Sequence, residues 1–522
     1  MCLPSKKDLI YKMTFVSPDY LLFVFGACLG YYIMPPKIRW LVLLAASLLF
    51  YYISGGFLII CILASSVSVY LGAARLDRLN TELAEELSTA VSEKKKIRAG
   101  YKRKKRLVMM TVLGLNLGLL CFFKYLGGLD QIFSSMSGIL AGSSFSISNM
   151  TAPLGISFYT LQAVGYLADV YWDKYRSERN IFRLMLFVCF FPQIAEGPIG
   201  RYNIIANQLF APNKLSVKNI GTGSRLILWG FFQKLVIANR IGLITSEIFS
   251  NHENYSGFII LMCAALYSFQ IYADFAGCID IVRGTARLFG IGLQKNFDAP
   301  FFAKSINEFW QRWHITLGAW LRDYIFYPVS RSKFCGWLSD RSQLLSAAFA
   351  LFFVWLGNGI WHGAGIKFIF YGMYYFAFML IGMIFEPIFS RFSFRENIIY
   401  KSFQVLRTVA IVFGGMLIFG SRSLSSAFSM MASIFQKTNG SFAGLMPSVQ
   451  LAPSDAVIIG VCAVMVIILD ICRLRNVSVG GWLNRRGVFT RWAIYTAIMI
   501  SVVVFGIYGS GYNASDFIYG AF

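Results

Sequence analysis

Apolar runs of membrane-spanning length recur along most of the chain. The first three are Tyr20–Met34, Ile38–Ile53 and Phe57–Ala74, and Gly55-Gly56 between the last two predicts a tight turn. Comparable runs follow at Leu107–Leu126, Pro153–Trp172, Ser224–Phe249, Phe258–Val282, Ser346–Trp361, Phe368–Phe385, Phe403–Phe419, Ala456–Ile471 and Trp492–Ile507. Because a helix needs about 20 apolar residues to cross a bilayer, the pattern predicts an all-α polytopic membrane protein. We expect about 11 transmembrane helices, with short re-entrant or interfacial helices besides.

Two apolar or amphipathic stretches are interrupted by residues that break helices. Ile181–Ile199 contains Phe191-Pro192-Gln193 and Glu196-Gly197-Pro198, and Arg283–Phe309 contains Asn296–Pro300. Non-helical backbone at membrane depth is tolerated only where it is buried in protein or lines a wet cavity. The first stretch therefore predicts a broken or re-entrant helix.

Composition narrows the class further. Hydrophobic residues make up 57% of the 522 positions and charged residues 14%, against about 25% charged in an ordinary soluble domain. No stretch is both polar enough and long enough to form a soluble domain, so we expect one integral domain over residues 1–522. The net charge of +23 is compatible with nucleic-acid or anionic-lipid binding. Since no nucleic-acid motif is present and the basic residues lie between apolar runs, the charge favours the positive-inside bias.

The most charged segment is Arg75–Arg106, with eleven Lys/Arg against five Asp/Glu. We expect this loop to be cytoplasmic. Counting back through the runs places Lys37 and Arg39 on the same side and the N-terminus outside. Gly127–Thr151 is rich in Ser and Gly and is expected to be an external loop. A docking surface for an acidic partner and a solvated helical hairpin both fit Arg75–Arg106.

The cysteines and the N-terminal segment add no further chemistry. Most of the ten cysteines lie within apolar runs and none forms a CxxC pair, so they indicate small buried hydrophobes, not a disulfide framework or metal site. Pro4–Lys12 is polar, and no small-residue cleavage site follows the first apolar run. That run is expected to remain as a helix instead of being removed as a signal peptide.

Two of the three histidines, His314 and His362, lie 48 positions apart beside long apolar runs. An ionisable group at membrane depth is costly and is by default a functional-site hypothesis. If Asn307–Arg322 is one helix, one face carries Trp310, Trp313, Leu317, Trp320 and Leu321. His314 would border that face of a short interfacial helix, either as a functional group or as a ring with its polar tip in water.

His362 is the stronger catalytic candidate. It follows the uncharged run Leu351–Trp361 and is surrounded by Gly357, Gly359, Gly363 and Gly365. Glycines permit close approach of a substrate or of another helix, and Gly359 with Gly363 also matches a GxxxG packing pair. Imidazole, with an unperturbed pKa near 6.5, can act as a general base at neutral pH.

The other polar candidates are weaker. The chain has no GxSxG elbow, P-loop or HExxH motif, and His252 lies in a polar segment typical of a loop. Asp274 and Asp280 flank Gly277 in an apolar run. They could be catalytic acids, or they could hydrogen-bond across helices or pair with an arginine.

Several of these stretches together resemble a known family. They are Phe15–Tyr32, Leu41–Tyr52, Gly155–Thr160, Phe190–Gln193, Gly197–Ile199, Gln270–Gly277, Asn296-Phe297, Phe309–Leu317, Trp320–Tyr324 and Trp361–Gly363. In this order they are similar to the membrane-bound O-acyltransferase (MBOAT) family, most of all to its bacterial alginate O-acetyltransferase branch. The teichoic-acid D-alanyl transfer protein is a related member.

The resemblance implies a ring of helices around a central tunnel, with a core over about residues 15–375 and further helices over about 400–522. It implies catalytic roles for His362 and His314. We expect Trp310, Trp313, Trp361, Asn358, Asp274 and Gln270 to line the tunnel. No metal or permanently bound cofactor is implied, and the acyl donor would be a co-substrate, either acyl-CoA or an acyl-carrier thioester. The expected location is the cell membrane.

The implied activity is transfer of an acyl group, first of all acetyl, from the cytoplasmic side to a hydroxyl of an extracellular polysaccharide, cell-wall polymer or partner protein. An extracytoplasmic or carrier protein is the implied partner, and nucleic acid is not. We expect His362 to remove the hydroxyl proton and His314 to orient an oxygen or stabilise the oxyanion. D-alanyl transfer towards teichoic acid is the nearest alternative. A transporter or flippase of an envelope precursor and a non-catalytic scaffold are alternatives from other classes.

Overall fold

The structure, a computed structural model, describes residues 13–137, 152–389, 397–439, 444–446, 449 and 451–508. Helices account for the regular structure in these ranges, where an isolated bridge between Phe297 and Trp313 is the one β-type pairing. The chain forms two compact units, one of residues 1–224 with 282–294 and the other of residues 225–281 with 295–522. The division passes through α8 and α10, each of which contributes to both units.

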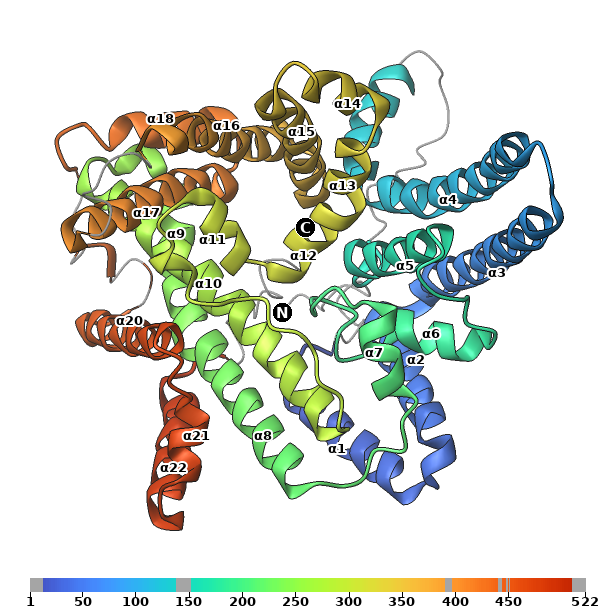
Figure 1. Cartoon of the computed structure of the whole chain (residues 1–522). Coiled ribbons are helices and arrows are strands. Elements are labelled where there is room, and N and C mark those ends of the chain that lie inside the picture. The colour runs from blue at the N-terminus through green and yellow to red at the C-terminus, as the bar shows by residue number, and fades with distance from the viewer. Residues whose placement is uncertain are drawn as a thin grey trace. The chain divides into compact units, whose positions relative to one another are not determined.

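The first unit contains the N-terminal helices. They are α1 Pro18–Ile33, α2 Arg39–Gly55, α3 Ile59–Thr89, α4 Lys94–Ser137, α5 Ile156–Tyr171, α6 Ile181–Cys189, α7 Tyr202–Leu209 and the start of α8, Val217–Phe231 (Figure 1). The Ser17 hydroxyl caps α1 by accepting from the Tyr20 N–H. Gly56 ends α2 with φ +57°, which confirms the predicted turn at Gly55-Gly56.

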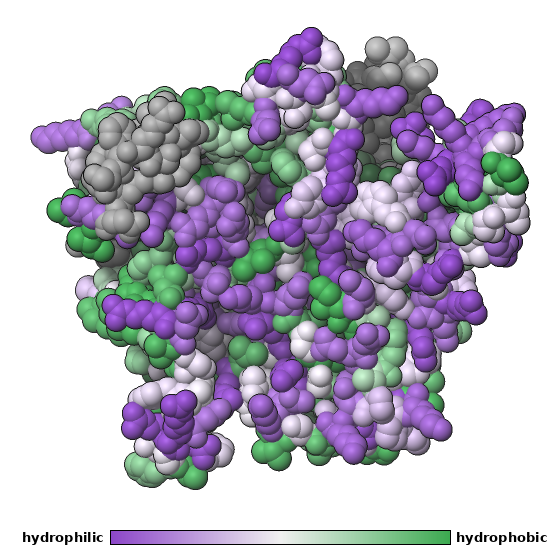
Figure 2. All heavy atoms as spheres, in the orientation of Figure 1, coloured by the Kyte–Doolittle hydropathy of each residue, from purple (hydrophilic) through white to green (hydrophobic). Residues whose placement is uncertain are grey.

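The charged segment Arg75–Arg106 forms the turn and the adjoining ends of a long hairpin of α3 and α4 (Figure 1). Figure 2 shows hydrophilic residues gathered over this end of the hairpin. The predicted solvated helical hairpin is confirmed. The predicted loop Gly127–Thr151 is wrong over residues 127–137, because α4 continues to Ser137. Two glycines in a helix cost only about 1 kcal/mol each, and the apolar residues after them continue the helix. Residues 138–151 lie outside the described residues.

The second unit contains the end of α8 and most of α10, Phe258–Leu288. Its other helices are α9 Asn239–Ser250, α11 Ile306–Arg312, α12 Ile315–Leu321, α13 Tyr327–Ser330, α14 Lys333–Ser339, α15 Gln343–His362, α16 Ile366–Phe389, α17 Ile398–Gly420, α18 Leu424–Ser433, α20 Pro453–Leu474, α21 Val479–Asn484 and α22 Val488–Phe505. A π-helical segment, Phe232–Ala238, joins α8 to α9, and a second, Arg322–Phe326, joins α12 to α13.

Nine candidate membrane spans occur within the described residues, and one of them, Pro36–Thr89, comprises both α2 and α3. Helix α1 is apolar but shorter. Length and composition together confirm an all-α, multi-pass membrane protein.

The predicted interruption of Ile181–Ile199 is confirmed. Helix α6 ends at Cys189, and the chain then runs through turns and irregular backbone until α7 begins at Tyr202. This irregular segment passes close to Gly155, which has φ +63° and where a Cβ atom would collide with the Ile194 carbonyl oxygen. Glycine is therefore required at position 155 both for its backbone conformation and for this close approach.

Candidate active site

His314 lies at a sharp bend between α11 and α12. Its φ and ψ are +46° and +50°, in the left-handed region, and its side chain is buried at 2% exposure. The prediction of a continuous helix over Asn307–Arg322 is wrong, and so is the interpretation of His314 as an interfacial ring with its tip in water. The Ile315 N–H donates to the carbonyl of Asn296, 3.0 Å away, instead of to the preceding turn.

The segment 296–298 fixes this bend from outside α11 and α12. The Asn296 Oδ1 accepts from the Thr316 N–H at 3.0 Å and from its hydroxyl at 2.6 Å. The Asp298 N–H donates to the Arg312 carbonyl at 3.0 Å, and Phe297 pairs with Trp313. We call these contacts the bend clamp. A non-glycine residue in the left-handed region is strained and persists where the surrounding structure over-determines it, and the bend clamp provides that constraint.

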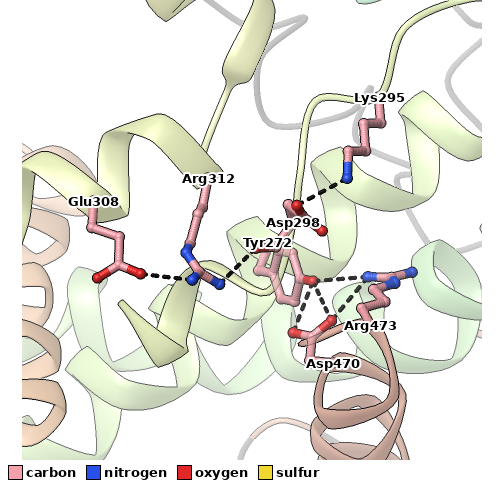
Figure 3. Close-up of polar contacts among 7 residues, drawn as sticks. All are labelled: Tyr272, Lys295, Asp298, Glu308, Arg312, Asp470 and Arg473. Atoms are coloured by element: carbon pink, nitrogen blue, oxygen red, sulfur yellow. Dashed lines mark hydrogen bonds and ion pairs between the residues drawn. The ribbon is translucent and has the colours of Figure 1, made fainter. Parts of the chain in front are cut away.

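Two ion pairs involve residues of the bend clamp. Arg312 reaches Glu308 at 2.6 Å and also donates to the Asp298 carbonyl at 3.4 Å, as Figure 3 shows. Lys295 pairs with the Asp298 carboxylate at 2.9 Å. The Lys295 and Asp298 side chains are about half exposed, at 55% and 44%, so that this pair adds little to stability by itself.

Aromatic rings enclose the His314 imidazole. Its centroid lies 4.8 Å from that of Phe275 and 5.8 Å from that of Trp361, both with edge-on geometry. Burial lowers the pKa of His314 from 6.5 to about 3, because a low-dielectric surrounding disfavours the charged form. His314 is therefore neutral at physiological pH, and one ring nitrogen carries a proton that can be donated in a hydrogen bond.

His362 reaches the same aromatic cluster from the end of a long helix. It is the last residue of α15 and is 2% exposed. The centroid of its ring lies 4.9 Å from that of Trp361, 5.3 Å from that of Phe419 and 5.7 Å from that of Tyr371. Trp361 thus contacts both imidazoles, which come from different elements.

The glycines around His362 pack α15 against α16. A Cβ atom on Gly359 would lie 2.5 Å from the Phe368 carbonyl oxygen, and one on Gly363 would collide with the Phe368 ring. Gly372 faces the Trp355 carbonyl in the same way. The packing interpretation of the Gly359 and Gly363 pair is therefore correct, and these two glycines are not evidence for substrate approach. Gly357 lies against Ile325, because a Cβ atom on Gly357 would be 3.1 Å from the Ile325 Cδ1 atom.

Trp310 and Asn358 present buried polar atoms beside this cluster. The Trp310 ring packs edge-on against Tyr375 at 4.8 Å and Trp355 at 5.0 Å. Asn358 precedes His362 by one helical turn and so shares its face of α15. Among the described residues, the buried Nε1 atoms of Trp310 and Trp313 and the Oδ1 of Asn358 lack a hydrogen-bond partner. A buried polar atom left in this state needs an explanation, and a polar ligand supplies one.

Asp274 and Asp280 hydrogen-bond across helices. Asp274 forms a 2.6 Å ion pair with Lys234, and both side chains are at most 4% exposed. Asp280 accepts from Gln233 at 3.4 Å. The predicted cross-helix interpretation agrees with these contacts, except that the basic partner of Asp274 is a lysine. Gly277 allows the approach, since a Cβ there would lie 2.9 Å from the Gly230 carbonyl.

Gln270, a third polar residue predicted on α10, bonds to α9. Its Oε1 accepts from the Thr245 hydroxyl at 2.5 Å. Sequence reasoning missed Lys234, although a lysine inside an apolar run was a visible signal for it. It also missed the role of Asn296, whose partner Thr316 follows 20 positions later. In the described ranges, no group of three or more His, Cys, Asp or Glu is placed to hold a metal ion.

The part of the chain that contains this cluster is similar to a known protein family. The model of the membrane-bound O-acyltransferase family matches residues 176–423, which include α11, α12, α15 and both histidines. The matched residues, which make up just under half of the chain, are similar to the MBOAT family. The resemblance seen in the sequence is thereby confirmed, while α20, α21 and α22 lie beyond the matched residues.

Three proteins similar to this chain illustrate the range of relatives. A probable alginate O-acetylase of Pseudomonas syringae is 30% identical over 61% of this chain and 59% of its own length. A peptidoglycan O-acetyltransferase of Helicobacter pylori is 32% identical over 52% and 54%. A teichoic acid D-alanyltransferase of Bacillus subtilis is 30% identical over 46% and 60%. Each match thus spans less than two thirds of the relative's length.

Proposed function

We propose that this protein is an O-acyltransferase that moves an acyl group, acetyl first of all, from an activated donor to a hydroxyl of an envelope polymer or partner protein. The observation that carries the proposal is the pair of buried imidazoles that both contact Trp361. Two of the relatives above are named for O-acetyl transfer. The third is named for D-alanyl transfer to teichoic acid, which makes D-alanine the second candidate acyl group.

The chemistry requires a base and a stabilised oxyanion. A thioester carbonyl is already activated, so the enzyme must hold the acceptor close and take up its proton. In the proposed mechanism His362 accepts the hydroxyl proton as the acceptor oxygen attacks the carbonyl carbon. His314, which is neutral, donates its N–H to the developing oxyanion. The carbon–sulfur bond then breaks, and the leaving thiolate takes the proton from His362.

The buried polar atoms near His362 support substrate binding at this place. Trp310 Nε1 is a donor only, and Asn358 Oδ1 is an acceptor. Between them they could hold the acyl carbonyl or an acceptor hydroxyl within the aromatic cluster. Trp361, which contacts both imidazoles, would exclude water from the reacting atoms.

The donor, the partner and the membrane belong to the same proposal. We infer that the donor is a co-substrate, acyl-CoA or an acyl-carrier thioester, supplied from the cytoplasmic side of the cell membrane. The acceptor is a polysaccharide or cell-wall polymer on the outer side, or an extracytoplasmic protein that passes the group on. The positive charge of Arg75–Arg106 supports the assignment of that hairpin to the cytoplasm.

The test is to replace His362 with alanine in a strain that lacks the chromosomal copy. We expect the ester released from envelope polymers by mild base, measured by mass spectrometry, to disappear, because a positioned base contributes roughly 10²–10⁴ in rate. His314→Ala should reduce the ester only in part. The control is His252→Ala, on the short helical turn His252–Asn254, which should leave the ester at the wild-type level.

The identity of the released group decides between the candidates. Acetate would support the first candidate and D-alanine the second. Unchanged ester in a well-expressed His362→Ala variant would refute the base assignment. Loss of transport of an unmodified precursor, with the ester intact, would favour the transporter interpretation instead.

A further inference from the structure

A buried polar cluster joins α10 to α20. The Tyr272 hydroxyl donates to Asp470, whose two carboxylate oxygens both lie 3.0 Å away. Arg473, one turn further along α20, pairs with Asp470 at 2.9 Å and reaches the Tyr272 hydroxyl at 3.3 Å. Figure 3 shows the three side chains converging. The Asp470 side chain is 3% exposed and that of Arg473 39%.

This cluster stands next to the support of His314. The Tyr272 ring lies 5.5 Å from Phe297 and 6.0 Å from Trp313, the two residues that pair in the bend clamp. Phe275, about one turn after Tyr272 on α10, packs on the His314 imidazole at 4.8 Å. One face of α10 therefore supports the bend on both sides of the Trp313–His314 peptide.

We propose that Asp470 and Arg473 are positioning residues for His314, which they hold through the hydroxyl and ring of Tyr272. The proposal rests on the proposed function for its catalytic meaning. It gives α20, which lies outside residues 176–423 matched by the family model, a part in completing the active site. The physical basis is that the hydrogen bonds from Arg473 and to Asp470 fix the position of the Tyr272 hydroxyl, so the ring cannot move away from Phe297 and Trp313, against which it packs.

Helix α20 also supplies a matched control. Near its other end, Asp455 forms a 2.8 Å ion pair with Arg240 of α9, and the two side chains are 16% and 6% exposed. Arg240 donates further to the carbonyls of Val236 and Phe505. This pair anchors α20 to α9 and to the end of α22, away from the residues of the bend clamp. A role of Asp470 limited to holding α20 in the bundle would be shared by Asp455.

The experiment compares Asp470→Asn, Tyr272→Phe and Asp455→Asn in the full-length, detergent-solubilised protein. Hydrogen exchange read by mass spectrometry reports on peptides covering residues 296–316, and the base-labile ester reports on activity in cells. We expect Asp470→Asn and Tyr272→Phe to speed exchange in those peptides about tenfold, which corresponds to about 1.4 kcal/mol of opening free energy. Both variants should also lower the ester content, while Asp455→Asn leaves both readouts unchanged. Tyr272→Phe removes one oxygen and keeps the ring, so it remains informative if Asp470→Asn does not fold.

Two results would overturn the proposal. The first is equal exchange in the 296–316 peptides for all three variants, whether fast or slow. The second is faster exchange confined to α20 itself, which is the signature of a merely structural pair. The exchange readout does not depend on acyl transfer. If His362→Ala retained transfer, the proposed function would fail while the coupling of Asp470 to the bend clamp could still be confirmed.

Discussion

His314 and His362 meet at Trp361 from supports that are built in opposite ways. His314 lies in strained backbone that is held in place by hydrogen bonds of its neighbours with Asn296 and Asp298. His362 ends the regular helix α15. Glycines near this end of α15 let its backbone approach the carbonyl and the ring of Phe368 on α16 closely. The first support depends on single polar atoms, and the second depends on the absence of side-chain volume. The two histidines should therefore respond to different kinds of substitution.

The largest effect is expected where volume is added beneath His362. In Gly359→Val the new side chain would meet the Phe368 carbonyl, 2.5 Å from the position of the Cβ, and backbone cannot move aside as a side chain can. We expect a loss of about 3 kcal/mol or more of unfolding free energy and no detectable ester. Thermal unfolding in detergent measures the first effect. Gly382→Val on α16 is the control, since nothing lies within 4 Å of that glycine. Equal losses from both variants would contradict the packing account.

A smaller effect is expected from removing one amide in the bend clamp. Asn296→Ala leaves the buried Thr316 N–H and hydroxyl without the Oδ1 that both contact. The cost of such a loss is about 1–3 kcal/mol, and the ester content should fall because His314 is no longer held. Thr316→Val removes only the hydroxyl and keeps the backbone hydrogen bond, so it should cost less. Equal destabilisation by Thr316→Val and Asn296→Ala in thermal unfolding would contradict the role given to the Asn296 amide in the bend clamp.

The smallest effect is a pH dependence that belongs to His314. Its folded pKa of about 3 lies below the unfolded value, so the unfolded chain binds more protons as the pH falls. The contribution of His314 to the free energy of unfolding is therefore fully present above about pH 6.5. It declines as the pH falls from there towards the folded pKa. Between pH 7.5 and 6.0 the loss is about 0.8 kcal/mol.

The comparison variant for this pH dependence is His314→Asn. Asparagine tolerates left-handed backbone but does not titrate in this range. The difference in melting temperature between pH 7.5 and pH 6.0 should therefore be smaller in the variant than in the wild type. An identical pH dependence in both proteins would show that His314 is not the group responsible.

Local sequence features predicted most of the helices, and long-range contacts account for what was missed. The apolar runs, Gly55-Gly56 and the prolines near Phe191 each act within a few residues, and the structure has the helices, turn and break that they indicate. The bend at His314 could not be predicted in this way. The spacing of Trp310, Trp313 and Leu317 satisfies a helical period on both sides of it, while its cause lies in Asn296 and Asp298.

In the candidate site, too, local sequence features were predictable and long-range contacts were not. Rarity of ionisable groups in apolar sequence was enough to select both histidines, and the structure buries both. The contacts of Tyr272 could not be predicted, because Asp470 follows it by 198 positions. The catalytic roles of the two histidines remain predictions, and the ester measurements above test them.

The buried pair of Lys234 and Asp274 has a consequence for how the chain enters the bilayer. Lys234 lies near the middle of the candidate span Val217–Ser250, where an unpaired lysine costs about 2.5–3.5 kcal/mol on the translocon scale. Its carboxylate partner is synthesised 40 residues later. Until α10 emerges from the ribosome, this span cannot gain the pairing with Asp274 that offsets its charge. The two spans are therefore best inserted as a unit, with α10 completing the membrane integration of the helix made before it.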